Sequence, residues 1–239
     1  MLEQNAYEFF CATKEQVPPA AIPYIYEKIW NGLGGVIDEL FPEFAKAFPL
    51  TCSALVLNWS KPIAVFEQFS GVWLSALVLE QPEENLFFCL KVPSCPVDGD
   101  DFDQTHAMLP PVWRELYRWF ESFAVTKKSI KPGSWINTPS RYSGRMPLED
   151  YRQKLGIGKS KARDFAKAIG SDQLMCWLRT DAGDALFLDE KHCDHKVYHV
   201  RGTALEDVCI LPDPAGTLDR YLAHYLSGKA PSEFDFRKS

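Results

Sequence analysis

The last third of the chain carries four short apolar runs at close spacing, followed by one amphipathic stretch. The runs are 173–180 (QLMCWLRT), 184–190 (DALFLDE), 196–201 (KVYHVR) and 206–212 (EDVCILP). Runs of this length separated by turns predict strands, and such short connections favour antiparallel neighbours. A helix is expected over 216–226. The sequence therefore predicts an α+β fold in which helices back an antiparallel sheet.

The region before this sheet predicts a helix-rich segment, then strands, then more helices. Helices are expected at 5–16, 21–35, 36–48 (kinked or restarted at Pro42), 109–123, 148–155 and 160–169. Strands are expected at 52–59, 71–80 and 86–92, and residues 126–147 resemble a loop. The polar segment 93–106 is the best linker. We expect an acidic α+β region at 1–100, as a separate domain or an elaboration, and an α+β domain at 105–230.

Charge is distributed unevenly along the 239 residues. Residues 1–100 hold 13 acidic and 5 basic residues, whereas 101–239 hold 19 acidic and 21 basic. An acidic front half disfavours nucleic acid as a partner of that part and suits a basic protein. The stretch 127–167 carries 11 basic against 3 acidic residues, a composition that solvated helix faces share.

Cysteine usage and hydropathy suggest where the protein resides. The seven cysteines are odd in number, and none forms a CxxC pair, so reduced thiols are expected rather than a disulfide framework. No apolar run reaches the roughly 18 residues of a membrane helix, and the N-terminus lacks the features of a secretory signal. We expect a soluble, cytoplasmic protein without a membrane partner.

Residues 188–200 (LDEKHCDHKVYHV) contain three of the five histidines, which raises the question of a metal site. Zinc needs three or four ligands in fixed geometry, and the HExxH pattern is absent. His192 and His195 fall on a loop between two strands, while His199 falls within a strand and need not face that loop. A hairpin loop is the favoured interpretation, and a metal-dependent hydrolase using the His192–His199 cluster is the alternative.

Two further motifs resemble a phosphate-binding loop and a calcium-binding loop, but each departs from the required pattern. GIGKSKARDF (156–165) lacks the first Walker glycine, because position 153 is Gln, so a helix–turn–helix corner is favoured over a phosphate site. DGDDFD (98–103) departs from the calcium-loop pattern at Phe102 and Asp103. It predicts either a solvated linker or an acidic surface for a basic partner. No GxSxG elbow or recognisable cysteine–histidine motif indicates an active site.

Three segments carry a family resemblance: LPPVWRELYRWFESF (109–123), DAGDALFLDEKHCDHKVYHV (181–200) and PAGTLDRYLAHYL (214–226). This pattern resembles the SUKH superfamily, the bacterial immunity-protein group that also includes a yeast cell-wall regulator. The match covers about half of the chain. The Asn-Gly-Gly that commonly follows the first helix is missing after Phe123, and the acidic first hundred residues have no counterpart in a minimal domain.

The resemblance implies protein binding, since many bacterial members neutralise nuclease or other toxin domains, and it offers no catalytic residues to carry over. We expect a non-enzymatic immunity protein that binds and neutralises a cognate, nuclease-type toxin, with no cofactor and no metal. A regulatory scaffold with an unrelated partner is a further alternative. Carboxylates could occupy the basic cleft that a nuclease presents to phosphates. The residues expected to contact the partner are Glu83, Glu84, Asp98, Asp100, Asp101, Asp103, Trp73 and Trp135. Trp113 and Trp119 are expected in the core instead.

Overall fold

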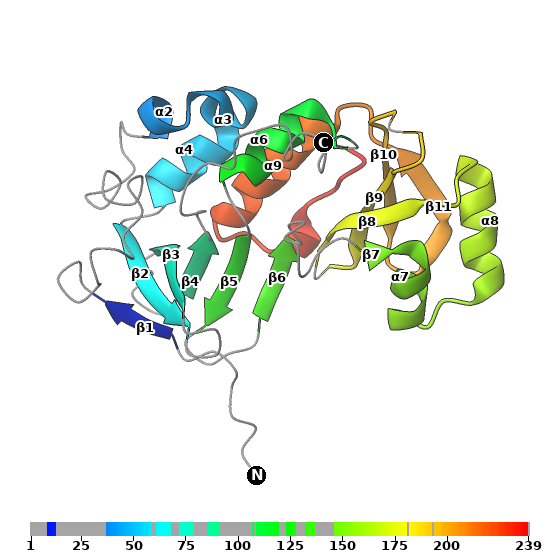
Figure 1. Cartoon of the computed structure of the whole chain (residues 1–239), viewed down its shortest axis with the longest axis horizontal. Coiled ribbons are helices and arrows are strands. Elements are labelled where there is room, and N and C mark those ends of the chain that lie inside the picture. The colour runs from blue at the N-terminus through cyan, green and yellow to red at the C-terminus, as the bar shows by residue number, and fades with distance from the viewer. Residues whose placement is uncertain are drawn as a thin grey trace, which may run out of the picture.

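The computed structural model describes residues 9–12, 37–58, 61–67, 72–78, 86–90, 107, 109–119, 123–127, 132–136, 146–180, 182–192 and 194–238. For the strands between residues 9 and 136, and for the end of the helix at 111–119, the description covers the backbone alone. Within these ranges, helices accompany two antiparallel sheets (Figure 1), which confirms the predicted α+β class.

The five-stranded sheet contains the four strands that the sequence predicts, together with a short fifth strand from the stretch predicted as a loop. Its strands are β7 (Met146–Pro147), β8 (Leu174–Arg179), β9 (Asp184–Asp189), β10 (Val197–Arg201) and β11 (Ala204–Ile210), in the order β11-β10-β9-β8-β7. Gly202 turns the chain between β10 and β11 with a φ of 58°, and its N–H donates to the carbonyl of Gly183 at 2.6 Å. The left-handed conformation at this turn suits glycine.

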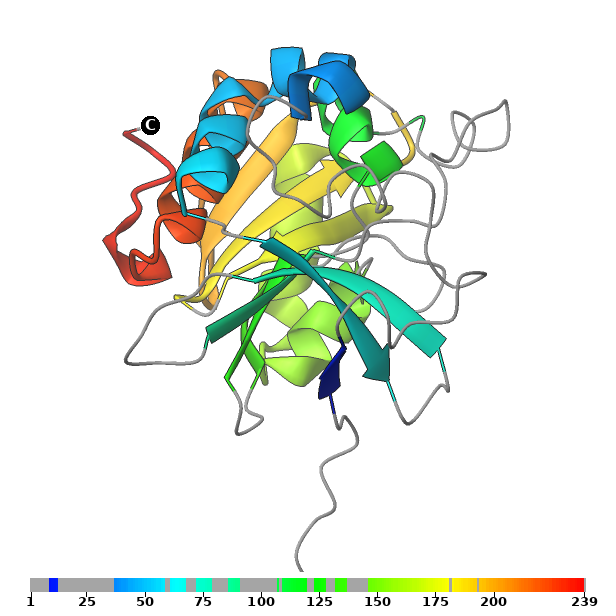
Figure 2. The same ribbon diagram turned by 90° about the vertical axis from the view of Figure 1, so that its left-hand side faces the viewer.

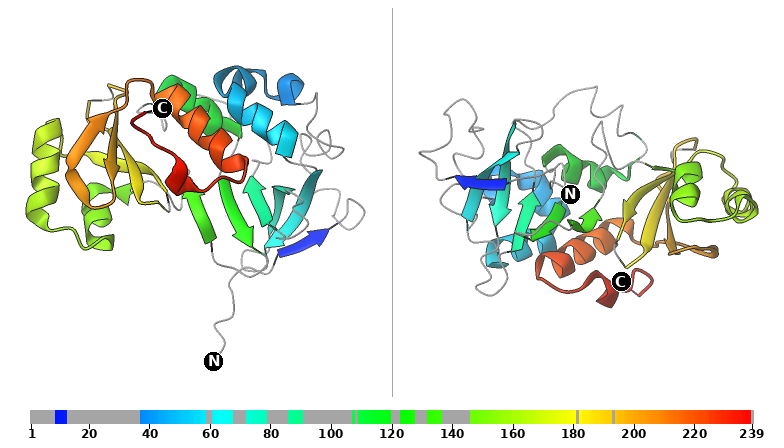
Figure 3. Two further views of the ribbon diagram at one scale, coloured as in Figure 1. Left: turned by 180° about the vertical axis from the view of Figure 1, so that it is seen from behind. Right: turned by 90° about the horizontal axis from the view of Figure 1, so that it is seen from below.

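Both faces of this sheet are covered. On one face, α7 (Leu148–Lys154) and α8 (Lys159–Ile169) enclose an apolar cluster in which the Tyr151 and Phe165 rings pack edge-on against Phe187. Figure 3 shows this helix pair on the far side of the sheet from the other helices. The two helices flanking Gly156–Gly158 agree with the predicted helix–turn–helix corner.

The opposite face packs against a group of helices and the C-terminal tail. These are α2 (Ile37–Leu40), α3 (Pro42–Ala47), α4 (Pro49–Asn58), α6 (Pro111–Trp119), α9 (Pro214–Leu226) and the 3-10 turn η3 (Pro231–Glu233). The restart at Pro42 is confirmed, and so is the core position of Trp113, which is 1% exposed. The core therefore joins helices from the first sixty residues to the C-terminal sheet and crosses the boundary between the two predicted ranges.

The predicted strand at 52–59 is wrong, because this segment belongs to helix α4, which lies beside α9 (Figure 2). Pro49 occupies the first turn, where its missing N–H does no harm. The Asp219 carboxylate of α9 accepts hydrogen bonds from the backbone N–H groups of Leu50 (3.1 Å) and Thr51 (2.8 Å). A residue remote in sequence thus supplies the N-terminal cap, which local periodicity cannot reveal.

The six-stranded sheet contains strands that were not predicted from the sequence. It comprises β1 (Phe9–Ala12), β2 (Lys61–Glu67), β3 (Val72–Val78), β4 (Leu86–Leu90), β5 (Phe123–Lys127) and β6 (Pro132–Ile136), in sequence order. The helix predicted over 5–16 is wrong at 9–12, where β1 pairs with β2. The loop predicted at 126–147 contains β6. The expected helix at 21–35 lies outside the described residues.

In the part of the chain that the structure describes, no helix combines the length and the apolar composition needed to cross a membrane.

Candidate functional site

Strand β9 begins and ends with an aspartate, and each aspartate pairs with a different histidine. Asp189 contacts the ring of His192 in the β9–β10 hairpin, and Asp184 contacts His199 in β10. Asp184 and Asp189 are five positions apart along the strand, which corresponds to about 17 Å, and an odd spacing directs their side chains to opposite faces of the sheet. The histidine-rich stretch is therefore divided between two sites.

The hairpin pair joins an exposed histidine to a buried aspartate. The His192 side chain is 50% exposed, whereas the Asp189 side chain is 2% exposed. Asp189 also accepts hydrogen bonds from the Ser171 hydroxyl (2.6 Å) and the Lys191 backbone N–H (2.9 Å). Burial acts to raise the pKa of Asp189, but the hydrogen bonds from Ser171, His192 and Lys191 outweigh it and hold the pKa below its ordinary value. This site is a carboxylate anchor for the hairpin.

The second pair is enclosed. The His199 side chain is 0% exposed, and its Nε2 lies 2.7 Å from Asp184 Oδ1. The Phe236 ring stacks on the imidazole with centroids 5.3 Å apart, and Phe236 is itself fully buried. Arg201 Nε lies 3.5 Å from the same Asp184 oxygen. The expectation that His199 need not face the hairpin loop is confirmed.

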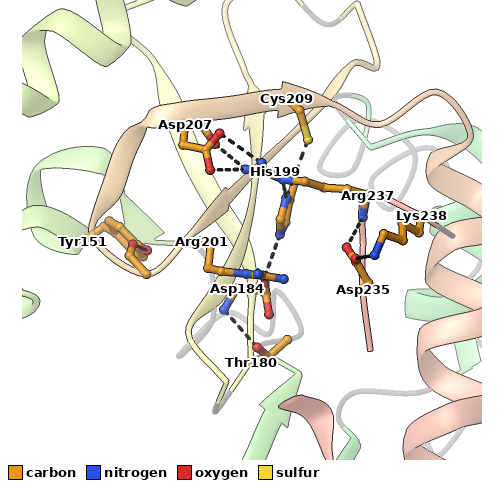
Figure 4. Close-up of polar contacts among 11 residues, drawn as sticks. Tyr151, Thr180, Asp184, His199, Arg201, Asp207, Cys209, Asp235, Arg237 and Lys238 are labelled. Atoms are coloured by element: carbon orange, nitrogen blue, oxygen red, sulfur yellow. Dashed lines mark hydrogen bonds and ion pairs between the residues drawn. The ribbon is translucent and has the colours of Figure 1, made fainter. Parts of the chain in front are cut away.

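The other nitrogen of His199 faces a thiol and a guanidinium group (Figure 4). Cys209 Sγ lies 3.7 Å from Nδ1, and Arg237 Nε donates to Nδ1 at 3.5 Å. Because a guanidinium can only donate, Nδ1 carries a lone pair here, and the ring proton belongs on Nε2 beside Asp184. The result is a line of thiol, imidazole and carboxylate on one face of the sheet.

The C-terminal tail holds this line in place. Arg237 donates to the Asp207 carboxylate (3.0 Å) and to the Asp207 carbonyl (2.6 Å), both on β11. The hydrogen bond from Arg237 holds the pKa of Asp207 below its ordinary value. Burial raises the pKa of Cys209, while the charge of Arg237 acts in the opposite direction. The tail thus places one cation beside a half-buried thiol.

These groups do not form a metal site. Cys209 and Asp184 lie at opposite nitrogens of the His199 ring, so they cannot converge on one ion. Among the described residues, no three His, Cys, Asp or Glu side chains are arranged to hold a metal. Cys193 lies outside the described residues.

The Cys209–His199 contact could not be predicted from the sequence, because the strand register is irregular. Continuing the pairing of Arg201 with Ala204 would place His199 opposite Glu206, but the observed partner is Cys209. A register shift between His199 and Arg201 produces this displacement. The alternation of side chains along β10 predicts which face of the sheet His199 occupies. The turn at Gly202 does not predict which residue of β11 lies opposite His199.

The predicted partner-contacting residues lie largely outside the described structure. This applies to Glu83, Glu84, Asp98, Asp100, Asp101 and Asp103. The backbone of Trp73 is described in β3 and that of Trp135 in β6, two strands that β4 and β5 separate. Their role stays a prediction.

An exposed apolar face on α4 is a second candidate site. Leu57 is 81% exposed, Leu50 48% and Val56 39%, and Ile210 is the only other large apolar side chain counted as exposed in the described part of the chain. Leu50 and Leu57 lie seven residues apart and so occupy one face of the helix. This face was not predicted from the sequence, because residues 52–59 were expected to form a strand.

Known proteins offer no guide to either site. No family model, curated protein or solved structure matches the chain.

Proposed function

We propose that the protein is a non-enzymatic, cytoplasmic immunity protein that binds a toxin through the exposed face of α4. The observation that carries this proposal is the concentration of exposed apolar side chains on that helix: Leu50, Val56 and Leu57. Scattered apolar residues are ordinary on a protein surface, but a cluster on one helix favours a protein–protein interface. The resemblance to an immunity-protein superfamily supports the same conclusion.

The anchoring of α4 suits it to binding. The opposite face of the helix is buried through Thr51, Cys52, Ala54 and Leu55. Its N-terminal end is fixed by Asp219, which accepts the Thr51 hydroxyl at 2.7 Å in addition to two backbone N–H groups. A rigidly held helix presents its apolar side chains without losing much conformational freedom when a partner binds.

Charge beside α4 favours a basic partner. The neighbouring helices α2 and α3 expose Asp38, Glu39 and Glu43 against Lys46. An apolar centre with a charged rim is the usual anatomy of a protein interface. Acidic rims speed association with basic surfaces, and a nuclease needs such a surface to hold phosphates. A nuclease-type toxin is therefore the partner class that we propose.

A protection assay tests this proposal directly. The protein would be produced together with toxins encoded beside it, and survival would be compared with that of cells producing Leu57→Asp. Loss of a central apolar contact is expected to weaken binding about 30-fold, as for an interface hot spot. Ile210→Asp is the matched control, because Ile210 is a similarly exposed apolar residue (54%) on β11, outside α4.

Three results separate the alternatives. Protection that Leu57→Asp removes and Ile210→Asp retains would support the proposal. Tight binding of a partner without protection would favour a regulatory scaffold that uses the same face. Hydrolytic activity that disappears with His192→Ala and His195→Ala would favour the metal-dependent hydrolase and contradict the immunity function.

The acidic segment offers an independent kinetic test. Reversing the charge of Asp98, Asp100, Asp101 and Asp103 is expected to slow association with the toxin and to flatten its dependence on salt, because steering acts through long-range charge. Stopped-flow association rates at several salt concentrations would measure the effect. Unchanged rates would show that this segment serves only as a linker.

A further inference from the structure

Cys209, His199 and Asp184 form a connected arrangement that the binding function does not use. Cys209 and His199 are directly opposite on the neighbouring strands β11 and β10. The Nδ1 lone pair of His199 faces the sulfur at 3.7 Å, and Nε2 faces the Asp184 carboxylate at 2.7 Å. An imidazole held between a thiol and a carboxylate can accept the thiol proton while the carboxylate fixes its orientation and tautomer.

We propose that Cys209 is a site of covalent oxidation by hydrogen peroxide, with His199 as the base and Asp184 as the positioning residue. This proposal is independent of the binding function. Cys209 lies on β11, the edge strand of the five-stranded sheet, and is only partly buried. Because Cys209 is partly exposed, a small oxidant can reach it.

The chemistry requires only peroxide as co-reactant. His199 Nδ1 takes the thiol proton and gives up the hydrogen bond that it accepts from Arg237 Nε, and the resulting thiolate attacks one oxygen of hydrogen peroxide. The S–O bond forms as the O–O bond breaks, and the leaving oxygen takes the proton back from His199. The sulfur is oxidised to sulfenic acid and the peroxide is reduced to water, so the thiol and hydrogen peroxide give sulfenic acid and one water molecule.

Groups around Cys209 stabilise the thiolate and the imidazolium that proton transfer to His199 produces. Burial disfavours an isolated thiolate, but proton transfer to His199 creates an adjacent imidazolium that Asp184 stabilises from its other side. The Arg237 guanidinium adds a second cation close to the sulfur. Burial raises the pKa of Cys52 and of Cys176 to about 12 and raises the pKa of Cys209 as well. Among the described residues, the difference is the histidine beside the Cys209 sulfur.

The test uses the full-length protein, hydrogen peroxide and dimedone, with mass spectrometry of each cysteine-containing peptide. In the folded protein we expect Cys209 to be trapped as sulfenic acid at least about tenfold faster than Cys176. His199→Gln keeps an amide that can donate to Asp184 but cannot take the proton, so it is expected to slow Cys209 oxidation about tenfold or more. His192→Gln is the matched control and is expected to leave the rate unchanged.

The dependence of the rate on pH gives a readout that needs no variant. An isolated thiol reacts about tenfold faster for each pH unit below its pKa. The paired thiol of Cys209 is expected to show a shallower rise between about pH 5 and 9, and Asp184→Asn is expected to restore the steep rise. A steep rise in the unmodified protein, or equal rates for folded His199→Gln and the unmodified protein, would overturn the proposal.

Discussion

The two ends of strand β9 carry the same pair of residue types in opposite surroundings. Asp184 and Asp189 are almost equally buried, with side chains 3% and 2% exposed, but the histidines that contact them are 0% and 50% exposed. The tail residues Phe236 and Arg237 cover His199, whereas nothing comparable is described over His192. Contacts with residues distant in the sequence, and not the local sequence, therefore determine which histidine is buried and which is exposed to solvent.

The largest expected effect follows from breaking the buried pair. His199→Ala leaves the Asp184 carboxylate in the core without its imidazole partner, while Arg201 Nε stays 3.5 Å from it. Loss of one partner from a buried pair lowers the free energy of unfolding by about 4 kcal/mol. Urea unfolding monitored by circular dichroism would measure the change. A loss below about 1 kcal/mol, typical of an exposed pair, would show that the pair is not buried in solution.

Truncating Phe236, which packs over His199, should have the next largest effect on the free energy of unfolding. Phe236→Ala deletes a fully buried ring that packs on both Tyr221 and His199, with centroids 4.9 Å and 5.3 Å away. Truncation of a buried phenylalanine lowers the free energy of unfolding by about 3 kcal/mol. Phe236→Leu retains most of the apolar volume and should recover most of that loss in the same unfolding measurement. Equal stability of Phe236→Ala and the unmodified protein would contradict a docked tail.

The hydrogen bond between Ser171 and Asp189 in the hairpin should contribute less to the free energy of unfolding than Phe236 does, and its contribution should depend on pH. Ser171→Ala removes the hydroxyl that donates to Asp189, and we expect a loss of about 1 kcal/mol near neutral pH. Because the folded pKa of Asp189 lies below its unfolded value, the stabilisation is complete above about pH 4 and is lost as pH falls through the folded pKa. Unfolding curves for both proteins should therefore converge in acid. A gap that widens in acid would contradict this prediction.

The exposed histidine should matter least. His192→Ala removes a half-exposed partner while Asp189 keeps its hydrogen bonds from Ser171 and Lys191. We expect a change below about 0.5 kcal/mol in the free energy of unfolding. The same measurement on His199→Ala provides the contrast. Similar losses in the two variants would remove the distinction between the pairs.

An element can be predicted from the sequence where nearby residues specify it, and cannot where distant residues do. The strands β8 to β11 follow from apolar runs and turns that each strand carries itself. Helix α4 does not, because Asp219 caps it from a position 168 residues away from Thr51. The contact between Cys209 and His199 depends on a register shift that the Gly202 turn does not specify. Both candidate sites arise from such tertiary effects.

The histidine–aspartate pairs His192–Asp189 and His199–Asp184 lie apart, which favours a binding protein over a metal-dependent hydrolase. The metal content of the protein purified from its own cells, compared with that of His192→Ala combined with His195→Ala, tests this claim most directly. We expect substoichiometric zinc and manganese in both samples. Stoichiometric metal in the unmodified protein that is lost from the double variant would contradict it.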